Sequence, residues 1–239
     1  MNWVLITSAI NSHYDNVSVA QRFQQTLMTG QSLKQKLEPC RTLLIETAME
    51  PLTNDQKQQL QLVFDGVVEF HGDHLMRQIH DCAASDVAWI KTPGELHALS
   101  SVIRVLPDVQ PRDRVWKISG RYQLDHDYDV AQHDQPGRIC LLARKPCVVY
   151  YVPDTELRHT PRYPSRYHSR LYSFCGSLLP VMQDRYQAMF RHVIDQYSAG
   201  CFTDIENTMF EFLHDLDPIE LHRVGVSGQQ ADDLCFITE

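Results

Sequence analysis

The chain lacks an excess of basic residues, and this absence limits its partners. It has 22 Lys and Arg residues against 30 Asp and Glu residues, which gives a formal net charge of −8. General nucleic-acid binders neutralise phosphates with a basic surface. The composition therefore predicts no nucleic-acid partner, although it is compatible with one local basic pocket.

Paired cysteines and long hydrophobic runs are also missing. The 7 cysteines are scattered, with no Cys-x-x-Cys pair, so neither a disulfide framework nor a zinc ribbon is favoured. Reduced thiols are typical of cytoplasmic proteins. No run approaches the length of a membrane span, and no basic segment followed by a long apolar one begins the chain. We expect a cytoplasmic protein with no transmembrane segment, and leave peripheral membrane association open.

Several common signatures of enzymes are absent as well. The sequence has no Gly-x-Ser-x-Gly elbow, no P-loop and no dinucleotide fingerprint. The His- and Asp-rich segments 71–74 and 80–82 lack the four-ligand spacing of a zinc site. There is no internal repeat, low-complexity segment or obvious linker, which favours one compact unit of 239 residues.

Strand and helix patterns alternate in the first part of the chain. Gly30 is expected to interrupt the first helix, and Thr53 is a candidate N-cap of the second. Such alternation favours a parallel sheet with crossover helices packed on it. The expected order is strand 3–10, helix 17–37, strand 43–45, helix 53–62 and strand 67–70.

The later part of the chain is less regular. A hairpin would add antiparallel strands to the sheet, and Thr203 with Glu206 has the pattern of a capping box. The expected elements are helix 91–106, strand 115–119, a hairpin of strands 139–143 and 148–152, strand 170–174, helix 184–197, helix 203–216 and strand 221–226. The Arg- and Tyr-rich stretch that includes Arg158, Arg162, Arg166 and Arg170 is expected to be a surface loop, with a sugar or phosphate contact as the alternative.

The most informative segment is the strand at 115–119 and the residues after it. A short apolar strand runs into Ser119-Gly120 and then presents Arg121 and Tyr122, with an Asp-x-Asp pair soon after. Ligands of open α/β sheets bind beyond the carboxyl ends of the strands, and Lys and Arg suit phosphate. Solvated charges in an ordinary turn explain the same pattern equally well.

The segment Lys-Ile-Ser-Gly-Arg-Tyr at 117–122 resembles a signature of bacterial and viral glycosyltransferase-like proteins with a GT-A type nucleotide-sugar fold. The resemblance covers most of the chain, from about residue 3 to about residue 230. Its other parts are a strand ending in Glu46, Lys-x-x-Gly-Glu at 91–95, Leu-Tyr-Ser at 171–173, Asp-Ile-Glu at 204–206 and Gly-Val-x-Gly at 225–228. The chain departs from the pattern at the end of the fourth strand, where typical members carry Asp-x-Asp and this sequence has Gly120-Arg121-Tyr122.

The resemblance implies an α/β, GT-A-like (Rossmann-like) single domain over 1–239, with a mixed, mostly parallel sheet flanked by helices. Residues 1–125 would form the nucleotide-binding half and 126–239 the acceptor-side half. The implied activity is transfer of a sugar from a nucleotide-sugar donor to a glycan or small-molecule acceptor, as in polysaccharide biosynthesis. The implied donor- or phosphate-binding residues are Thr7, Ser8, Glu46, Lys91, Glu95, Lys117, Ser119, Gly120, Arg121 and Tyr122.

The resemblance also implies a base for the acceptor hydroxyl, either Glu206 or Asp204. Helix capping explains these carboxylates equally well, because the macrodipole favours negative charge in a first helical turn. The charge of the leaving group would be met by Mn²⁺ or Mg²⁺, or directly by Lys117, Arg121 and Lys91. The implied metal ligands are Asp125, Asp127 and His222, and the two aspartates are equally well explained as turn residues.

Two further functions stay open at this point. The chain fits a catalytically inactive nucleotide- or glycan-binding α/β module that retains the same fold. It also fits a nucleotidyltransferase, which would release pyrophosphate instead of a nucleoside diphosphate.

Overall fold

The computed structural model describes residues 1–12, 17–82, 88–147, 162–230 and 235–239. Its main feature is a seven-stranded sheet that combines strands from both halves of the chain. The strands of this sheet are β1 (Asn2–Ser8), β2 (Cys40–Glu46), β3 (Gly66–Glu69), β4 (Arg114–Ser119), β6 (Ile139–Leu142), β9 (Leu171–Cys175) and β10 (Ile219–Leu221).

The sheet is mixed and mostly parallel. Its strand order is β10-β6-β9-β4-β1-β2-β3, and of these seven strands β9 alone runs antiparallel to its neighbours. The chain first lays β2 and β3 on one side of β1, and then returns to lay β4 on the other side. The position between β1 and β4 is therefore the topological switch point of the sheet.

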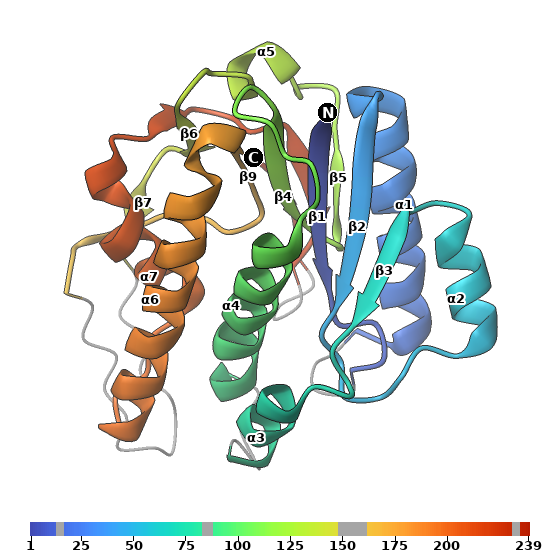
Figure 1. Cartoon of the computed structure of the whole chain (residues 1–239), viewed down its shortest axis with the longest axis horizontal. Coiled ribbons are helices and arrows are strands. Elements are labelled where there is room, and N and C mark those ends of the chain that lie inside the picture. Colours follow the sequence, from blue (N-terminus) through green and yellow to red (C-terminus); the bar gives the residue numbers. More distant parts are fainter. Residues whose placement is uncertain (13–16, 83–87, 148–161, 231–234) are drawn as a thin grey trace.

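Helices cover both faces of the sheet (Figure 1). On the face toward the viewer lie α3, α4 and α6, whereas α1 and α2 lie on the other face. This arrangement confirms the predicted fold class, an α/β protein with a mixed sheet flanked by helices. The helices are α1 (Val19–Leu37), α2 (Asn54–Gln61), α3 (His74–Cys82), α4 (Ala88–Val105), α5 (Val130–His133), α6 (Leu179–Ser198) and α7 (Ile205–Leu213).

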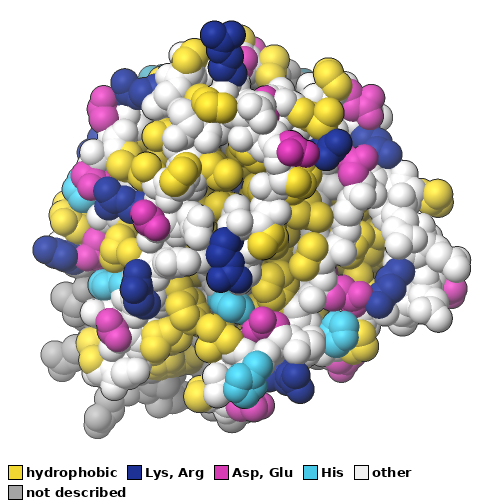
Figure 2. Space-filling view, in the orientation of Figure 1, with side chains coloured by type: hydrophobic (Ala, Val, Ile, Leu, Met, Phe, Trp, Pro, Cys, Tyr) yellow, Lys and Arg dark blue, Asp and Glu magenta, His cyan; other side chains and the backbone are white. Residues whose placement is uncertain are grey.

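Alternating side chains of the strands build two hydrophobic cores. In β1, Trp3 and Leu5 face the core under α4 and α6, while Val4 and Ile6 face the core under α1 and α2. Burial of each such side chain contributes roughly 2 kcal/mol. Edge strand β3 is only half-buried, and Figure 2 shows hydrophobic side chains at the surface between α4 and β3.

Two small sheets complete the fold. The first contains β5 (Tyr122–Leu124), β11 (Val226–Gln229) and β12 (Phe236–Thr238), in the order β12-β11-β5. The second pairs β7 (Lys145–Pro146) with β8 (Ser165–Arg166). None of the helices that the structure describes is long and apolar enough to cross a membrane.

Gly30 does not interrupt the first helix, contrary to the prediction. Helix α1 continues through it without a break. A Cβ added at Gly30 would lie 2.7 Å from the ring of Phe64, so the glycine allows the loop after α2 to pack closely on α1. The residue is needed for packing between elements, which a local pattern does not reveal.

Two predicted helix starts are also wrong. Helix α4 extends back to Ala88, and Pro93, Gly94 and Glu95 lie inside it, so the backbone amides of Gly94 and Glu95 are not at a helix N-terminus. The last long helix is capped by Asp204 instead of Thr203, whose hydroxyl contacts that of Thr208. Aspartate is as good an N-cap as threonine.

One predicted strand is wrong, and another lies outside the described residues. The range 221–226 is no single strand, because β10 ends at Leu221 in the main sheet and β11 begins at Val226 in the small one. The second strand of the predicted hairpin, 148–152, and Arg158 lie outside the described residues. The segment expected to be the hairpin turn contains β7, which pairs with β8.

Candidate functional site

The carboxyl ends of β1, β2 and β4 meet at the lower end of the sheet in Figure 1. This edge includes the switch point between β1 and β4, where open α/β sheets bind their ligands. Two adjoining cavities lie here, and Ala9, Arg22, Thr47 and Lys91 line both of them. We call the combined space the strand-end cleft. In Figure 2, charged and histidine side chains gather along the lower edge of the molecule.

The two cavities differ in their linings. The smaller, of about 120 Å³, lies against the ends of β1 and β4 and is lined by Thr7, Ser8, Glu95, Ser119, Gly120 and Arg121, among others. The larger, of about 220 Å³, is mainly apolar and is lined by Met49, Met76 and Ile90 together with Asn11, Glu50 and His80. Arg22, Lys91 and Arg121 all line the smaller cavity, which we call the cationic part of the cleft, and the larger cavity adds an apolar surface.

Arg121 follows Gly120 just after the end of β4 and lines the smaller cavity. Its Nη1 atom is buried and has no hydrogen-bond partner among the described residues. Burying an unpaired guanidinium nitrogen costs free energy, so a ligand that accepts this hydrogen bond would be stabilised. The guanidinium carbon also lies 6.0 Å from the centre of the Tyr122 ring, within the range of a cation–π interaction.

Gly120 holds the ends of β1 and β4 together at the cleft. Its backbone N–H donates to the Thr7 carbonyl at 2.8 Å. A Cβ at this position would lie 3.2 Å from that carbonyl oxygen and 3.2 Å from the Ser8 Cβ. The absence of a side chain therefore lets the two strand ends approach closely.

Arg22 is a cleft residue that the sequence patterns did not identify. It lies on α1, is 7% exposed and donates from Nε to the Val17 carbonyl at 3.3 Å. Its spacing in the sequence could have identified it, because Arg22, Thr26 and Leu33 share the buried face of the helix. Lys91, predicted from the Lys-x-x-Gly-Glu segment, lines both cavities from α4.

Lys117 is not at the surface of the cleft. Its side chain is 1% exposed, lies 2.5 Å from Glu95 Oε1 and donates to the Ser169 carbonyl at 2.7 Å. Thr7 Oγ1 donates to the same Glu95 oxygen at 3.0 Å. Glu95 lines the smaller cavity. Lys117 therefore positions Glu95 from beneath the cleft.

Glu46 is also internal, although it was predicted to bind the donor. It is 1% exposed, and its oxygens accept hydrogen bonds from Ser8 Oγ at 2.5 Å, the Ile10 N–H at 2.9 Å and the Ala48 N–H at 3.0 Å. Burial raises the pKa of Glu46 to about 7, against the opposing effect of these hydrogen bonds. Glu46 thus organises the loops that follow β1 and β2.

Glu206 lies in the first turn of α7, beside Arg166 at 3.1 Å. Its side chain is mostly buried, and burial raises its pKa despite the neighbouring cations. Asp204, the second predicted catalytic carboxylate, is the N-cap of the helix and accepts from the Asn207 N–H at 2.8 Å. The geometry accounts for Asp204 as a cap, whereas Glu206 is not a cap.

Arg170 is linked to Glu206 by electrostatic interaction and to Tyr122 by a hydrogen bond. His168 and Arg170 both act electrostatically on Glu206. Arg170 Nε donates to the Tyr122 hydroxyl at 3.3 Å and also pairs with Glu239. Tyr122 is buried and directly follows Arg121. Glu206 is not among the residues found to line the cleft.

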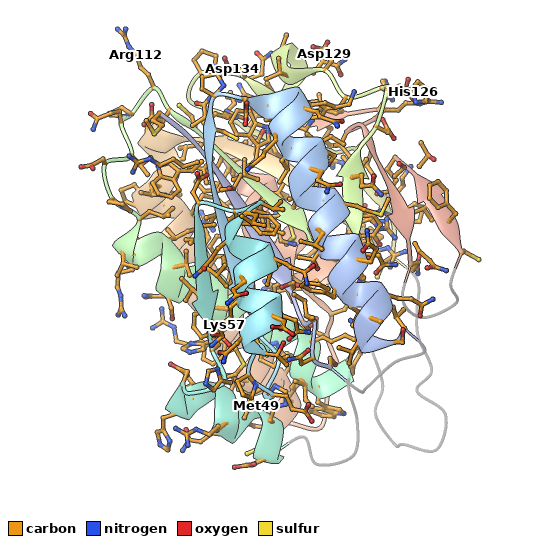
Figure 3. All side chains as sticks on the ribbon, turned by 90° about the vertical axis from the view of Figure 1, so that its right-hand side faces the viewer. Met49, Lys57, Arg112, His126, Asp129 and Asp134 are labelled. Carbon is orange, nitrogen blue, oxygen red and sulfur yellow. The ribbon has the colours of Figure 1, made fainter. Side chains whose placement is uncertain are left out.

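The three predicted metal ligands lie elsewhere. Asp125, His126 and Asp127 form a group whose ligand atoms all lie within 4.8 Å of one another, and His222 is not part of it. The group follows β5, which runs back toward the amino end of the sheet. Figure 3 shows His126 at the opposite end of the molecule from Met49, which lines the cleft. Asp127 pairs there with Arg223.

The structure therefore divides the predicted site residues into four groups. Those that line the cleft are Thr7, Ser8, Lys91, Glu95, Ser119, Gly120 and Arg121. Glu46, Lys117 and Tyr122 are buried, Asp204 and Glu206 lie at the start of α7 and do not line the cleft, and Asp125, Asp127 and His222 lie outside it.

Comparisons with known proteins add similar solved structures but no family. A scan against protein-family models and a search of curated protein sequences each found no match. The chain is similar to apo mouse xyloside xylosyltransferase 1, at 12% identity over 90% of this chain and 82% of that one, with a TM-score of 0.47. It is also similar to CMP:2-keto-3-deoxy-manno-octonic acid synthetase in complex with CTP, at 11% identity over 85% and 89%, with a TM-score of 0.41. With TM-scores below 0.5, neither likeness decides the function of this chain.

Proposed function

We propose that the chain is a GT-A-like glycosyltransferase that moves a sugar from a nucleotide-sugar donor to a glycan or small-molecule acceptor. The observation that carries the proposal is the strand-end cleft, where Arg22, Lys91 and Arg121 surround a cavity at the switch point of the sheet. An unpaired nitrogen of Arg121 is buried there. Such a set of cations suits a diphosphate, which accepts charge-assisted hydrogen bonds from several donors.

The larger cavity suits the base of the donor. Met49, Met76 and Ile90 offer an apolar surface, and Asn11 and Glu50 offer polar groups at its margin. Pockets for flat heterocycles usually combine these two features. The donor would then lie with its base in the larger cavity and its phosphates between Arg22, Lys91 and Arg121.

Glu206 is the proposed general base in an inverting transfer. The acceptor hydroxyl gives its proton to the Glu206 carboxylate, and the acceptor oxygen bonds to the anomeric carbon of the donor. The bond from that carbon to the phosphate oxygen breaks, and the nucleoside diphosphate leaves with the electron pair. The raised pKa of Glu206 supports this role, because a base works best with a pKa near the working pH.

A divalent metal for the donor phosphates does not fit the predicted aspartates. Asp125 and Asp127 lie at the other end of the sheet, and Asp127 is paired with Arg223. We therefore assign stabilisation of the leaving group to the cations of the cleft, chiefly Arg121, and derive no step through a metal.

A binding experiment tests the first part of the proposal. UDP, GDP, CDP and dTDP sugars, each with and without Mn²⁺, are added to the protein and thermal unfolding is followed. A ligand at 100 times its Kd should raise Tm by roughly 5 to 10 °C for a chain of this size. Absence of a shift with every nucleotide would contradict the proposal.

A turnover experiment tests the second part. Glu206→Gln should lower kcat by roughly 10²- to 10⁴-fold without weakening donor binding. Because the base must be ionised, wild-type activity should rise with pH through a pKa above the usual carboxyl range. Glu211→Gln, on the same helix and paired with Arg162, is the matched control and should keep full activity.

The products separate the alternatives. A nucleoside diphosphate released from a nucleotide sugar supports the transferase. Pyrophosphate released from a nucleoside triphosphate and a sugar phosphate would indicate a nucleotidyltransferase. Binding without turnover, with acceptors present, would indicate an inactive module.

A further inference from the structure

A carboxylate lies within the cationic part of the cleft. Among the described residues that line the smaller cavity, Glu95 is the only acidic one, and it shares that cavity with Arg22, Lys91 and Arg121. A carboxylate repels phosphate, so Glu95 does not suit the phosphate contact expected from the sequence. Glu95 therefore suits a part of the ligand other than its phosphates.

Glu95 is held in one orientation by partners on a single oxygen. Thr7 Oγ1 donates to Oε1 at 3.0 Å, and Lys117 Nζ lies 2.5 Å from the same atom. Lys117 is itself fixed by the Ser169 carbonyl at 2.7 Å. The carboxylate is therefore positioned before any ligand arrives, which reduces the entropy lost on binding.

The other oxygen of Glu95 remains available. Oε2 has no hydrogen-bond partner among the described residues, and the side chain is 21% exposed and lines the smaller cavity. Because Lys117 balances the carboxylate charge, the pair does not require a second cation at Oε2. A neutral hydroxyl is the donor that best suits this atom, since it can donate one hydrogen bond without adding charge.

We propose that Glu95 is a specificity-determining residue that recognises a ring hydroxyl of the ligand through Oε2. The inference rests on the proposed function, and it names the chemistry that the cleft selects beside the phosphates. The hydroxyl belongs either to the ribose of the nucleotide or to the transferred sugar. Sites built to bind a hydroxyl reject analogues that lack it, because their polar groups then stay unpaired.

The test measures binding by calorimetry with wild-type protein, Glu95→Gln and Glu95→Asp. The probes are inorganic pyrophosphate, the diphosphates UDP, GDP, CDP and ADP, their 2′- and 3′-deoxy forms, and their glucose conjugates. Glu95→Asp keeps the charge but withdraws the carboxylate by one methylene, so it is informative even if Glu95→Gln unfolds. The matched control is Glu69→Gln, since Glu69 also pairs with a lysine, Lys57, but lines neither cavity.

Both Glu95 variants should bind the hydroxyl-bearing ligand about 10- to 100-fold more weakly, as expected for a hydrogen bond to a charged group. Pyrophosphate should bind them as well as the wild type, or more tightly. If the ribose is recognised, the diphosphates lose affinity and the deoxy form lacking that hydroxyl is insensitive to the variants. If the transferred sugar is recognised, the diphosphates are unaffected and the glucose conjugates lose affinity.

Two results would overturn the inference and differ in what they imply. If the wild type and both Glu95 variants bind the nucleoside diphosphates and their glucose conjugates with equal affinity, the role of Glu95 alone is overturned. Failure of every nucleotide to bind the wild-type protein would overturn the proposed function together with it.

Discussion

Two arginines at opposite ends of β4 have opposite surroundings. Arg114, where the strand begins, is 1% exposed and donates to Ser173 Oγ, to the Gln135 and Arg138 carbonyls and to Cys140 Sγ. Arg121, just after the strand ends, has a buried nitrogen without a partner and lines a cavity. The comparison teaches that satisfaction of the donors, and not burial or charge, distinguishes a structural cation from one available to a ligand.

The largest effect is expected from Arg114→Met. The substitution leaves two backbone carbonyls and the Ser173 hydroxyl without their donor in a buried place. Each such group costs about 1 to 3 kcal/mol, so the three together should lower the free energy of unfolding by at least about 3 kcal/mol. Urea unfolding measures this loss.

The matched control for Arg114 is Arg138→Met. Arg138 pairs with Asp217 at the surface, and such a pair contributes at most about 1 kcal/mol. If both variants lose the same free energy of unfolding, the comparison fails, because the hydrogen bonds donated by Arg114 would then add no more stability than a surface ion pair.

Glu46 extends the comparison to a carboxyl group at the cleft end, because its oxygens are all engaged. Burial raises its folded pKa to about 7 from 4.5. Below pH 4.5 both states bind the proton. Between pH 4.5 and 7 the unfolded chain has lost it while the folded protein keeps it, so stability falls with rising pH, by up to roughly 3 kcal/mol.

Glu46→Gln should remove this pH dependence, since the amide resembles the protonated carboxyl group. Urea unfolding at pH 5, 6, 7 and 8 gives the slope for wild-type protein and variant. Glu69→Gln is the control, because the pKa of Glu69 is lowered by its partner Lys57 and its loss should not flatten the slope. A slope that persists in Glu46→Gln would assign the titration to another group.

Arg121→Met should have the reverse profile of Arg114→Met. Stability should change by less than about 0.5 kcal/mol, because the lost guanidinium nitrogen had no partner and the aliphatic stem is kept. Affinity for the nucleoside diphosphate should fall about 10- to 100-fold. Calorimetry and thermal unfolding of the same sample separate the two quantities, and a loss of stability without a loss of affinity would show that Arg121 is structural.

Much of the framework was predictable, because local rules decide it. The strand before Gly120 and Arg121 and the N-cap at Thr53 follow from patterns of a few residues, and both are present. The neighbours of Lys117 were not predictable, since Glu95 reaches it from a helix and Ser169 from a distant segment. Lys117 and Arg121 look alike in the sequence, and only tertiary contacts separate their roles.

The position of Asp125 and Asp127 shows the same limit. They follow Arg121 closely in the sequence, so they were predicted to lie beside it. The intervening strand β5 turns back along the molecule, and its three residues advance the chain by roughly 10 Å. No composition or spacing near Arg121 announces this reversal, which depends on pairing with β11, about a hundred residues later.

The smallest effect is expected from Asp127→Asn, and it tests whether the amino end of the sheet takes part in binding at all. Asp127 pairs with the largely exposed Arg223, so its loss should cost less than about 1 kcal/mol. Nucleotide affinity, measured with and without Mn²⁺, should stay within roughly twofold of the wild type, because a charge at that distance is largely screened. If affinity or activity depends on Mn²⁺ and this dependence disappears in Asp127→Asn, residues at both ends of β4 take part in one binding site. The distinction between a structural end at Arg114 and a binding end at Arg121 would then fail, because the metal-binding residues would belong to the end that we assign to structure alone.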